Sequence, residues 1–197
     1  MTTRIITPPA IEPLTLEEVK VNLNIDHSDA GSDADLLGMI AAARESVEGE
    51  CRQSLMLQTL ELTLPAFPAW CIRLERPPVI AVTNVTYTDT DGASVVLDPS
   101  AYTLDNSSEP PRLVPTYGTT WPAAQASVNA VRVRYTAGYS DSIDPTVARA
   151  AVPYKLKRYI HLLVGDQERN RTASAEKPTV RHDLARGLLF GHQDFSL

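Results

Sequence analysis

The sequence predicts an α+β fold, in which a small bundle of three main helices carries an inserted antiparallel β-sheet or small barrel and an extended C-terminal tail. Apolar residues recur at helical spacing near both ends of the chain, but at every second position in its middle. An Asp-Gly pair between two β-rich segments is typical of a hairpin turn. We therefore expect N-terminal helices in residues 1–54, an inserted β lobe in 55–140, a C-terminal helix in 141–171 and a tail in 172–197.

Local signals predict the first two helices. Thr15 and Glu18 have the spacing of a capping box, in which each side chain accepts a hydrogen bond from the other residue's amide, so a helix should cover about residues 15–24. Ser32 or Asp33 should cap a second helix that continues to about residue 52. Its apolar stripe should pack against the other helices. The stripe consists of Leu36, Ile40, Ala43, Val47 and Cys51.

The β lobe begins where the apolar period changes to two. Leucines alternate with Thr59, Glu61 and Thr63, which predicts a strand whose polar side chains form one wet face. Further on, residues 129–137 alternate again, with valines and a tyrosine on one face and Arg132 and Arg134 on the other. We interpret this arginine pair as a solvated strand face or as a contact with a neighbouring subunit.

A hairpin is expected in the centre of the lobe. Pro77 and Pro78 give a rigid, extended start to a strand over residues 79–87, which are largely β-branched or aromatic. Asp91 and Gly92 should supply the positive φ angles of a two-residue turn before the chain resumes as a strand. A short strand over 101–104 and a proline-rich turn at 111–115 complete about six predicted strands.

The C-terminal part begins with Asp144 and Pro145, which suit the cap and first position of a short helical turn over 145–151. The main third helix should run from Pro153 to about residue 170. Its predicted stripe consists of Leu156, Ile160, Leu163 and Gln167, thickened by Tyr159 and Val164. Beyond a linker, the tail holds one apolar cluster, Leu188-Leu189-Phe190, which is either mobile or ordered on a partner.

Charge is distributed unevenly along the chain. Residues 1–148 carry 9 basic and 19 acidic side chains, whereas residues 149–197 carry 9 basic and 5 acidic ones. An acidic body argues against a conventional DNA-binding module, which needs clustered lysine and arginine. It is compatible with a surface along which DNA slides without sticking. The start of the chain lacks the pattern of a signal peptide and no stretch is apolar enough for a membrane span, so we expect a cytoplasmic protein.

No residue pattern indicates catalysis, a cofactor or a metal. The chain has no nucleophile elbow, phosphate-binding loop or dinucleotide fingerprint around its four histidines, His27, His161, His182 and His192. Cys51 and Cys71 lack the spacing of a zinc site, and the aspartates between residues 26 and 35 lack that of a calcium loop. A small enzyme or a carbohydrate-binding β module remains an alternative interpretation.

Five segments together resemble the head-tail connector (adaptor) proteins of long-tailed bacteriophages, in particular the subfamily with a β-sheet inserted into a small helical connector. The longest covers residues 76–92 (RPPVIAVTNVTYTDTDG) and is followed by 97–102 (LDPSAY). The others are 14–20 (LTLEEVK), 111–122 (PRLVPTYGTTWP) and 162–165 (LLVG). None of them is a catalytic signature, and it is their order and spacing that carry the resemblance.

The resemblance implies a structural virion protein that forms a ring, of twelve copies, beneath the portal and links the capsid to the neck or tail. Its implied partners are other copies of itself, the portal, the next neck or tail protein and passing double-stranded DNA. The implied location is the virion neck, after assembly in the host cytoplasm. Another neck component, such as a stopper, is the alternative. Candidate portal contacts are Arg169, Arg171, Leu188, Leu189 and Phe190, and candidate subunit contacts are Arg132 and Arg134.

Overall fold

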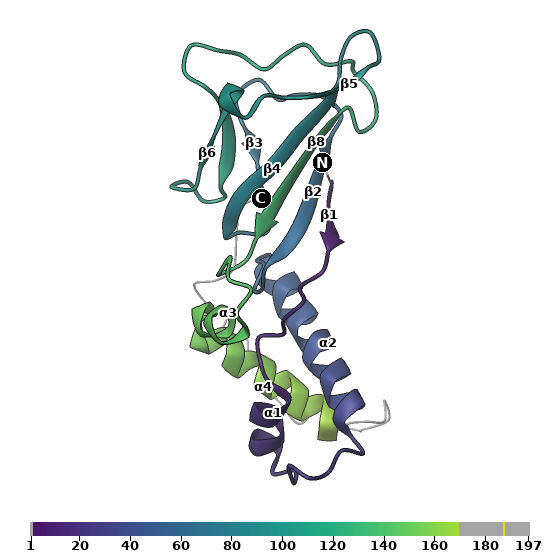
Figure 1. The fold of residues 1–197 in the computed structure, drawn as a ribbon, viewed down its shortest axis with the longest axis vertical. Coiled ribbons are helices and arrows are strands. Elements are labelled where there is room, and N and C mark those ends of the chain that lie inside the picture. Colours follow the sequence, from purple (N-terminus) through teal and green to yellow (C-terminus); the bar gives the residue numbers. More distant parts are fainter. Residues whose placement is uncertain (1, 170–186, 188–197) are drawn as a thin grey trace.

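The computed structural model describes residues 2–169 and Gly187, and these form an elongated molecule with helices at one end and β-sheets at the other (Figure 1). This arrangement confirms the predicted α+β class. The helices are α1 (Leu16–Leu23), α2 (Asp33–Cys51), α3 (Pro145–Ala151) and α4 (Tyr154–Arg169), and a 3₁₀ turn covers Pro99–Ala101. The strands are β1 (Thr2–Thr7), β2 (Gln58–Leu64), β3 (Ile72–Arg73), β4 (Val79–Thr88), β5 (Ser94–Val96), β6 (Tyr102–Asp105), β7 (Arg112–Pro115) and β8 (Val131–Ala137).

The start of α1 confirms the predicted capping box. The Thr15 hydroxyl accepts a hydrogen bond from the Glu18 amide at 3.1 Å, and the Glu18 carboxylate accepts one from the Thr15 amide at 2.8 Å. Beyond α1 the chain wraps around the buried ammonium of Lys20, which donates to the carbonyls of His27 and Asp29 and pairs with Asp33 at 2.5 Å. One internal cation therefore orders the acidic loop that leads into α2.

The helices enclose a first apolar core in which α2 packs against α4. All five residues of the predicted α2 stripe are fully buried. On α4 the predicted stripe is largely confirmed, because Leu156, Tyr159, Ile160 and Val164 are in the core and Leu163 packs against it, whereas Gln167 is only half-buried. The most buried face of α4 is the one that packs against α2. No helix within residues 2–169 is long and apolar enough to cross a membrane.

Two antiparallel sheets enclose a second core. The larger has the order β1-β2-β8-β4-β5 and the smaller has the order β3-β7-β6. Their inner faces contribute Leu60, Leu62, Val133, Ile72 and Leu113, all of them buried. Trp121 closes one side of this core by stacking on Phe67, with ring centroids 5.1 Å apart. Each end of the molecule therefore has its own core, while the boundaries predicted for the domains stay a prediction.

Two local expectations in the β lobe are wrong, and one strand of its larger sheet was missed. The hairpin between β4 and β5 closes through residues 89–93, because the Asp89 carboxylate accepts hydrogen bonds from the amides of Asp91 and Ala93 and only Gly92 has a positive φ, of 85°. Residues 111–115 are not a turn, since β7 pairs with both β3 and β6. The edge strand β1 was not predicted at all.

A buried carboxylate joins the two ends of the molecule. Glu48, near the end of α2, accepts hydrogen bonds from the Leu55 amide at 2.8 Å and the Gln58 side chain at 3.2 Å through one oxygen. Its other oxygen accepts from Arg44 at 3.0 Å, and Arg44 also donates to Glu12 at 2.8 Å. Burial raises the pKa of Glu48, although the Leu55 amide and Arg44 oppose that effect. These hydrogen bonds therefore hold α2 and β2 in one relative orientation.

The return connection from the lobe is equally tight. Gly138 follows β8 with a φ of 146°, and its amide donates to the Pro78 carbonyl at 2.9 Å. A Cβ atom at this position would lie 2.7 Å from the Met56 carbonyl carbon and 2.8 Å from the Leu57 nitrogen. Both are main-chain atoms that cannot rotate away. Gly138 is therefore required both by its backbone angle and by the close approach of the chain.

We predict that Glu48→Ala lowers the free energy of unfolding by about 3–5 kcal/mol, because it leaves the buried Leu55 amide without its acceptor and removes the buried carboxylate partner of Arg44, which keeps only its contacts to Glu12 and Glu45. Urea denaturation measures the change. Glu45→Ala is the matched control on the same helix, since the Glu45 side chain is 69% exposed, and it should alter stability by less than about 0.5 kcal/mol. Equal effects of the two substitutions would contradict the role assigned to Glu48.

Gly138→Ala should destabilise the protein by about 1–3 kcal/mol, because the added methyl group meets main-chain atoms and the backbone angle is unfavourable for alanine. The control is Gly49→Ala, in an exposed part of α2 where a Cβ meets nothing within 4 Å. That change should stabilise the protein by up to about 1 kcal/mol. Thermal unfolding of both variants tests the pair, and a harmless Gly138→Ala would refute the close-approach argument.

Candidate functional site

The outward face of the larger sheet gathers the arginines singled out in the sequence. Pairing between strands aligns Arg4 of β1 with Glu61 of β2, and Glu61 with Arg134 of β8. One pair further along, Arg132 of β8 lies between Thr63 and a threonine of β4. We call this surface the arginine face. It consists of Thr2, Arg4, Thr59, Glu61, Thr63, Asn84, Thr86, Arg132, Arg134 and Thr136.

Glu61 lies at the centre of the arginine face and is neutralised from both sides. Its two oxygens accept hydrogen bonds from Arg4 at 3.1 Å and from Arg134 at 2.8 Å. The Glu61 side chain is only 7% exposed, whereas those of Arg4 and Arg134 are 66% and 41% exposed. Burial raises the pKa of Glu61, but the hydrogen bonds and charges of Arg134 and Arg4 outweigh it, so the pKa lies below its ordinary value.

The predicted wet face of β2 is therefore wrong at Glu61. The residue lies on the expected side of the strand, but two guanidinium groups cover it. One of them comes from β1, which the sequence analysis missed. The alternation predicted for β8 is confirmed, because Val131, Val133 and Tyr135 are fully buried on the opposite face. Tyr135 donates its hydroxyl to the Glu75 carbonyl at 2.7 Å, which anchors the strand.

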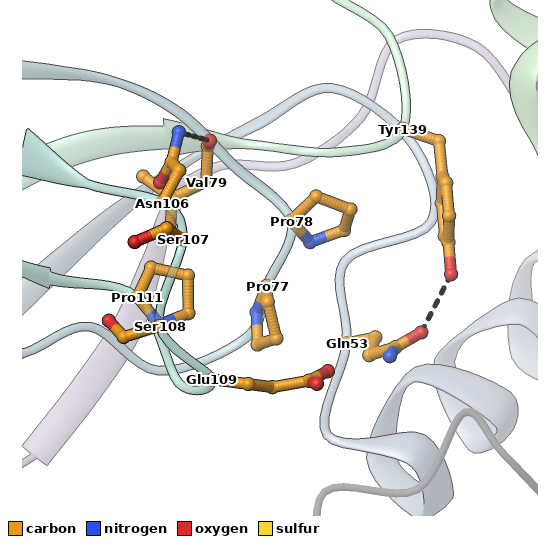
Figure 2. A pocket seen from close by; sticks show the side chains of 10 residues that line it. All are labelled: Gln53, Pro77, Pro78, Val79, Asn106, Ser107, Ser108, Glu109, Pro111 and Tyr139. Atoms are coloured by element: carbon orange, nitrogen blue, oxygen red, sulfur yellow. Dashed lines mark hydrogen bonds between the residues drawn. The ribbon is translucent and has the colours of Figure 1, made fainter.

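A second surface feature is an open, polar pocket of about 430 Å³ between the two ends of the molecule (Figure 2). Figure 2 shows Pro77 and Pro78 between a cluster around Asn106 and the pair formed by Gln53 and Tyr139. Asn106 donates to the Val79 carbonyl at 3.0 Å, and the Tyr139 hydroxyl donates to Gln53 at 2.9 Å. The Asn106 bond lies within the β lobe, whereas the Tyr139–Gln53 bond joins the chain after β8 to the segment that follows α2.

The groove between α1 and α4, of about 520 Å³, contains His27 and His161 beside Glu17, Glu18 and Lys157. Burial lowers the pKa of His161, and the nearby Glu18 only partly offsets this. The Thr15 hydroxyl in the same groove is already engaged in the capping box. Within residues 2–169 and Gly187, no group of three or more His, Cys, Asp or Glu side chains could hold a metal ion.

The candidate portal contacts are only partly placed. Arg169 is exposed at the last residue of α4, at the opposite end of that helix from the β lobe (Figure 1). Arg171, Leu188, Leu189 and Phe190 lie outside the described residues, as do His182 and His192. Sequence reasoning missed Arg4 and the buried role of Glu61. The β-branched run TTRIIT at residues 2–7 was the available signal for the strand that carries Arg4.

Comparison with solved structures shows that the whole fold has precedents. A chain in the neck of an empty gene transfer agent particle, computed with C6 symmetry, matches with a TM-score of 0.80 at 21% identity. A chain of the native particle's virion matches with a TM-score of 0.79 at 21% identity, and one in its neck, computed with C12 symmetry, with 0.75 at 22%. Each match covers 100% of this chain and 97% of the other. No protein-family model and no curated protein sequence matches.

Glu61→Gln should lower the free energy of unfolding by about 1 kcal/mol at neutral pH, a modest value because both guanidinium groups are partly solvated. The folded-state pKa of Glu61 is depressed, so its ionic stabilisation is complete above the unfolded value near 4.5 and is lost as the pH falls through the folded value. The difference from the wild type, measured by urea denaturation, should therefore shrink only below about pH 4.5. A difference independent of pH would show that the stabilisation is not ionic.

Proposed function

We propose that this protein is a structural component of a virion neck: a head-tail connector (adaptor) that forms a ring beneath the portal of a phage-like particle. The observation that carries the proposal is the match of the complete fold, helices and inserted sheets together, to chains of a gene transfer agent neck. The order of motifs in the sequence supports the same assignment. The role follows from shape and assembly rather than from catalysis.

The proposed ring has twelve copies, in keeping with the C12 symmetry used for one of the matching necks. Contacts between different surfaces of successive copies close a ring when the rotation completes one full turn. Such a ring extends the portal channel and presents a platform for the next neck or tail protein. The rigid junction formed by Glu48 and Gly138 suits this task, because a platform requires a constant angle between the helices and the sheets.

The proposed partners are the portal, the next neck or tail protein and passing double-stranded DNA. Arg169 and the tail, with Arg171 and the apolar cluster Leu188-Leu189-Phe190, contact the portal. The next neck or tail protein binds elsewhere on the ring, and double-stranded DNA passes through it without sequence-specific binding. The chain carries more acidic than basic side chains, which limits adhesion of phosphates to the channel wall. The protein is assembled in the host cytoplasm and resides in the neck of the virion.

Negative-stain imaging of the purified protein, alone and mixed with the portal from the same genome, tests this proposal. A closed ring stacked coaxially on the portal is the expected result. A protein that associates with neither the portal nor assembled particles would refute it. A ring that binds an existing connector ring instead of the portal would assign the protein to the stopper position.

The portal contacts have a separate test. Deleting residues 172–197 should abolish stacking on the portal, and replacing both Arg169 and Arg171 with alanine should weaken it at least tenfold, because the positive charges next to the tail are lost. Lys155→Ala, an exposed change near the other end of α4, is the matched control and should leave stacking intact. Co-sedimentation with the portal measures all three. Undiminished stacking of the truncated protein would exclude the tail as the portal contact.

A further inference from the structure

We infer that the arginine face is the surface with which each copy binds an acidic surface of the next copy in the ring. The inference rests on the proposed function, because it assumes that a ring exists. It adds to that function the identity of one contact surface, the chemistry of its partner and the residues Arg4, Arg132 and Arg134 as its charged groups.

The arginine face is an uncovered layer of the fold. The inner face of the larger sheet packs against the smaller sheet, and the core between them contains residues from strands and from the loops between them. The helices have their own core at the other end of the molecule. In the described part of the chain, no helix lies over the outward face (Figure 1). Within the described residues, the outward surface of the sheet is therefore open to another copy.

The composition of this face differs from that of an ordinary solvated sheet surface. It has three arginines, five threonines and no lysine, and its single carboxylate, Glu61, is shared between two of the arginines. Arginine is enriched at protein interfaces, whereas lysine and glutamate are depleted there. Val96, aligned with Thr86 at the edge of the sheet, is 62% exposed and adds one apolar side chain that a protein partner could cover.

The arginines are also held in place before any partner arrives. Glu61 binds Arg4 and Arg134 through one nitrogen of each guanidinium, and the exposed remainder of each group still carries donors. Side chains that are already ordered lose less conformational entropy on binding. Arg132 is exposed and makes no hydrogen bond or ion pair through its side chain within residues 2–169, so its whole guanidinium is available to a carboxylate.

Charge determines which partner this face accepts. Two arginine faces repel each other, so a symmetric contact between two copies through this face is unfavourable. The rest of the chain is acidic, with 19 acidic against 9 basic side chains in residues 1–148. Exposed carboxylates occur on helices and loops outside the arginine face, including those of Glu17, Asp35, Glu45, Glu109 and Asp141. A contact between unlike surfaces satisfies both charges, and repeated contacts of that kind are the ones that close a ring.

Charge reversal tests the inference. Arg132→Glu should reduce the fraction of rings at least tenfold, measured by native mass spectrometry of the protein alone and by counting copies seated on the portal. Arg73→Glu is the matched control, an exposed arginine reversed on a strand of the smaller sheet, and it should leave the rings unchanged. Urea denaturation of both variants verifies that they remain folded. Added salt should weaken wild-type rings in the same direction.

The partner surface is identified with the variant Arg132→Lys, whose assembled rings are treated with a carbodiimide that joins an amine directly to a neighbouring carboxylate. The expected product links this position to an acidic residue of a second copy. A link to the portal alone, or loss of DNA binding in Arg132→Glu with intact rings, would overturn the inference and assign the face to that other partner.

The two proposals fail differently. If wild-type protein forms rings and Arg132→Glu forms them equally well, the arginine face is not the contact and the connector assignment stands. If wild-type protein forms no ring, either alone or on the portal, the connector assignment fails and this inference fails with it.

Discussion

The structure depends on one buried carboxylate at the junction between its two cores. Glu48, in the last turn of α2, binds Arg44 within the same helix and, at the same time, binds the Leu55 amide and Gln58 at the start of the β lobe. A charge this deeply buried is stable only when all its partners are in place. The helices and the sheets are therefore linked in one relative orientation, and Gly138 allows the returning chain to pass close enough to close the junction.

Rigidity of this kind suits a protein whose proposed task is geometric. In a ring, a small change of angle within one copy is repeated in every copy, so a flexible hinge between the cores would prevent closure. The larger sheet has its own buried carboxylate, Glu61, which holds Arg4 and Arg134 on the outward face. A buried carboxylate bound by arginine therefore occurs twice. Glu48 sets the angle between the two cores, and Glu61 orders two arginine side chains at the surface.

Part of the fold and of the candidate site could be predicted from sequence. The α+β class, the capping box at Thr15 and the alternation that places Arg132 and Arg134 on one face of β8 all depend on neighbouring residues, and the structure agrees with them. The β4–β5 turn was wrong because the Asp89 side chain competes for the turn amides. Strand β1 and the burial of Glu61 were missed because both result from pairing with residues more than fifty positions away.

Local spacing along the chain specifies the type of each segment, because helices and strands are encoded by apolar periods of two to four residues. Which surfaces remain exposed depends instead on how those segments pack against one another. Glu61 has the local pattern of a solvated residue, yet two distant arginines converge on it and make it nearly inaccessible. The site arises from charges on three strands that meet only when the sheet is assembled, since the energy of each ion pair depends on a distance that folding creates.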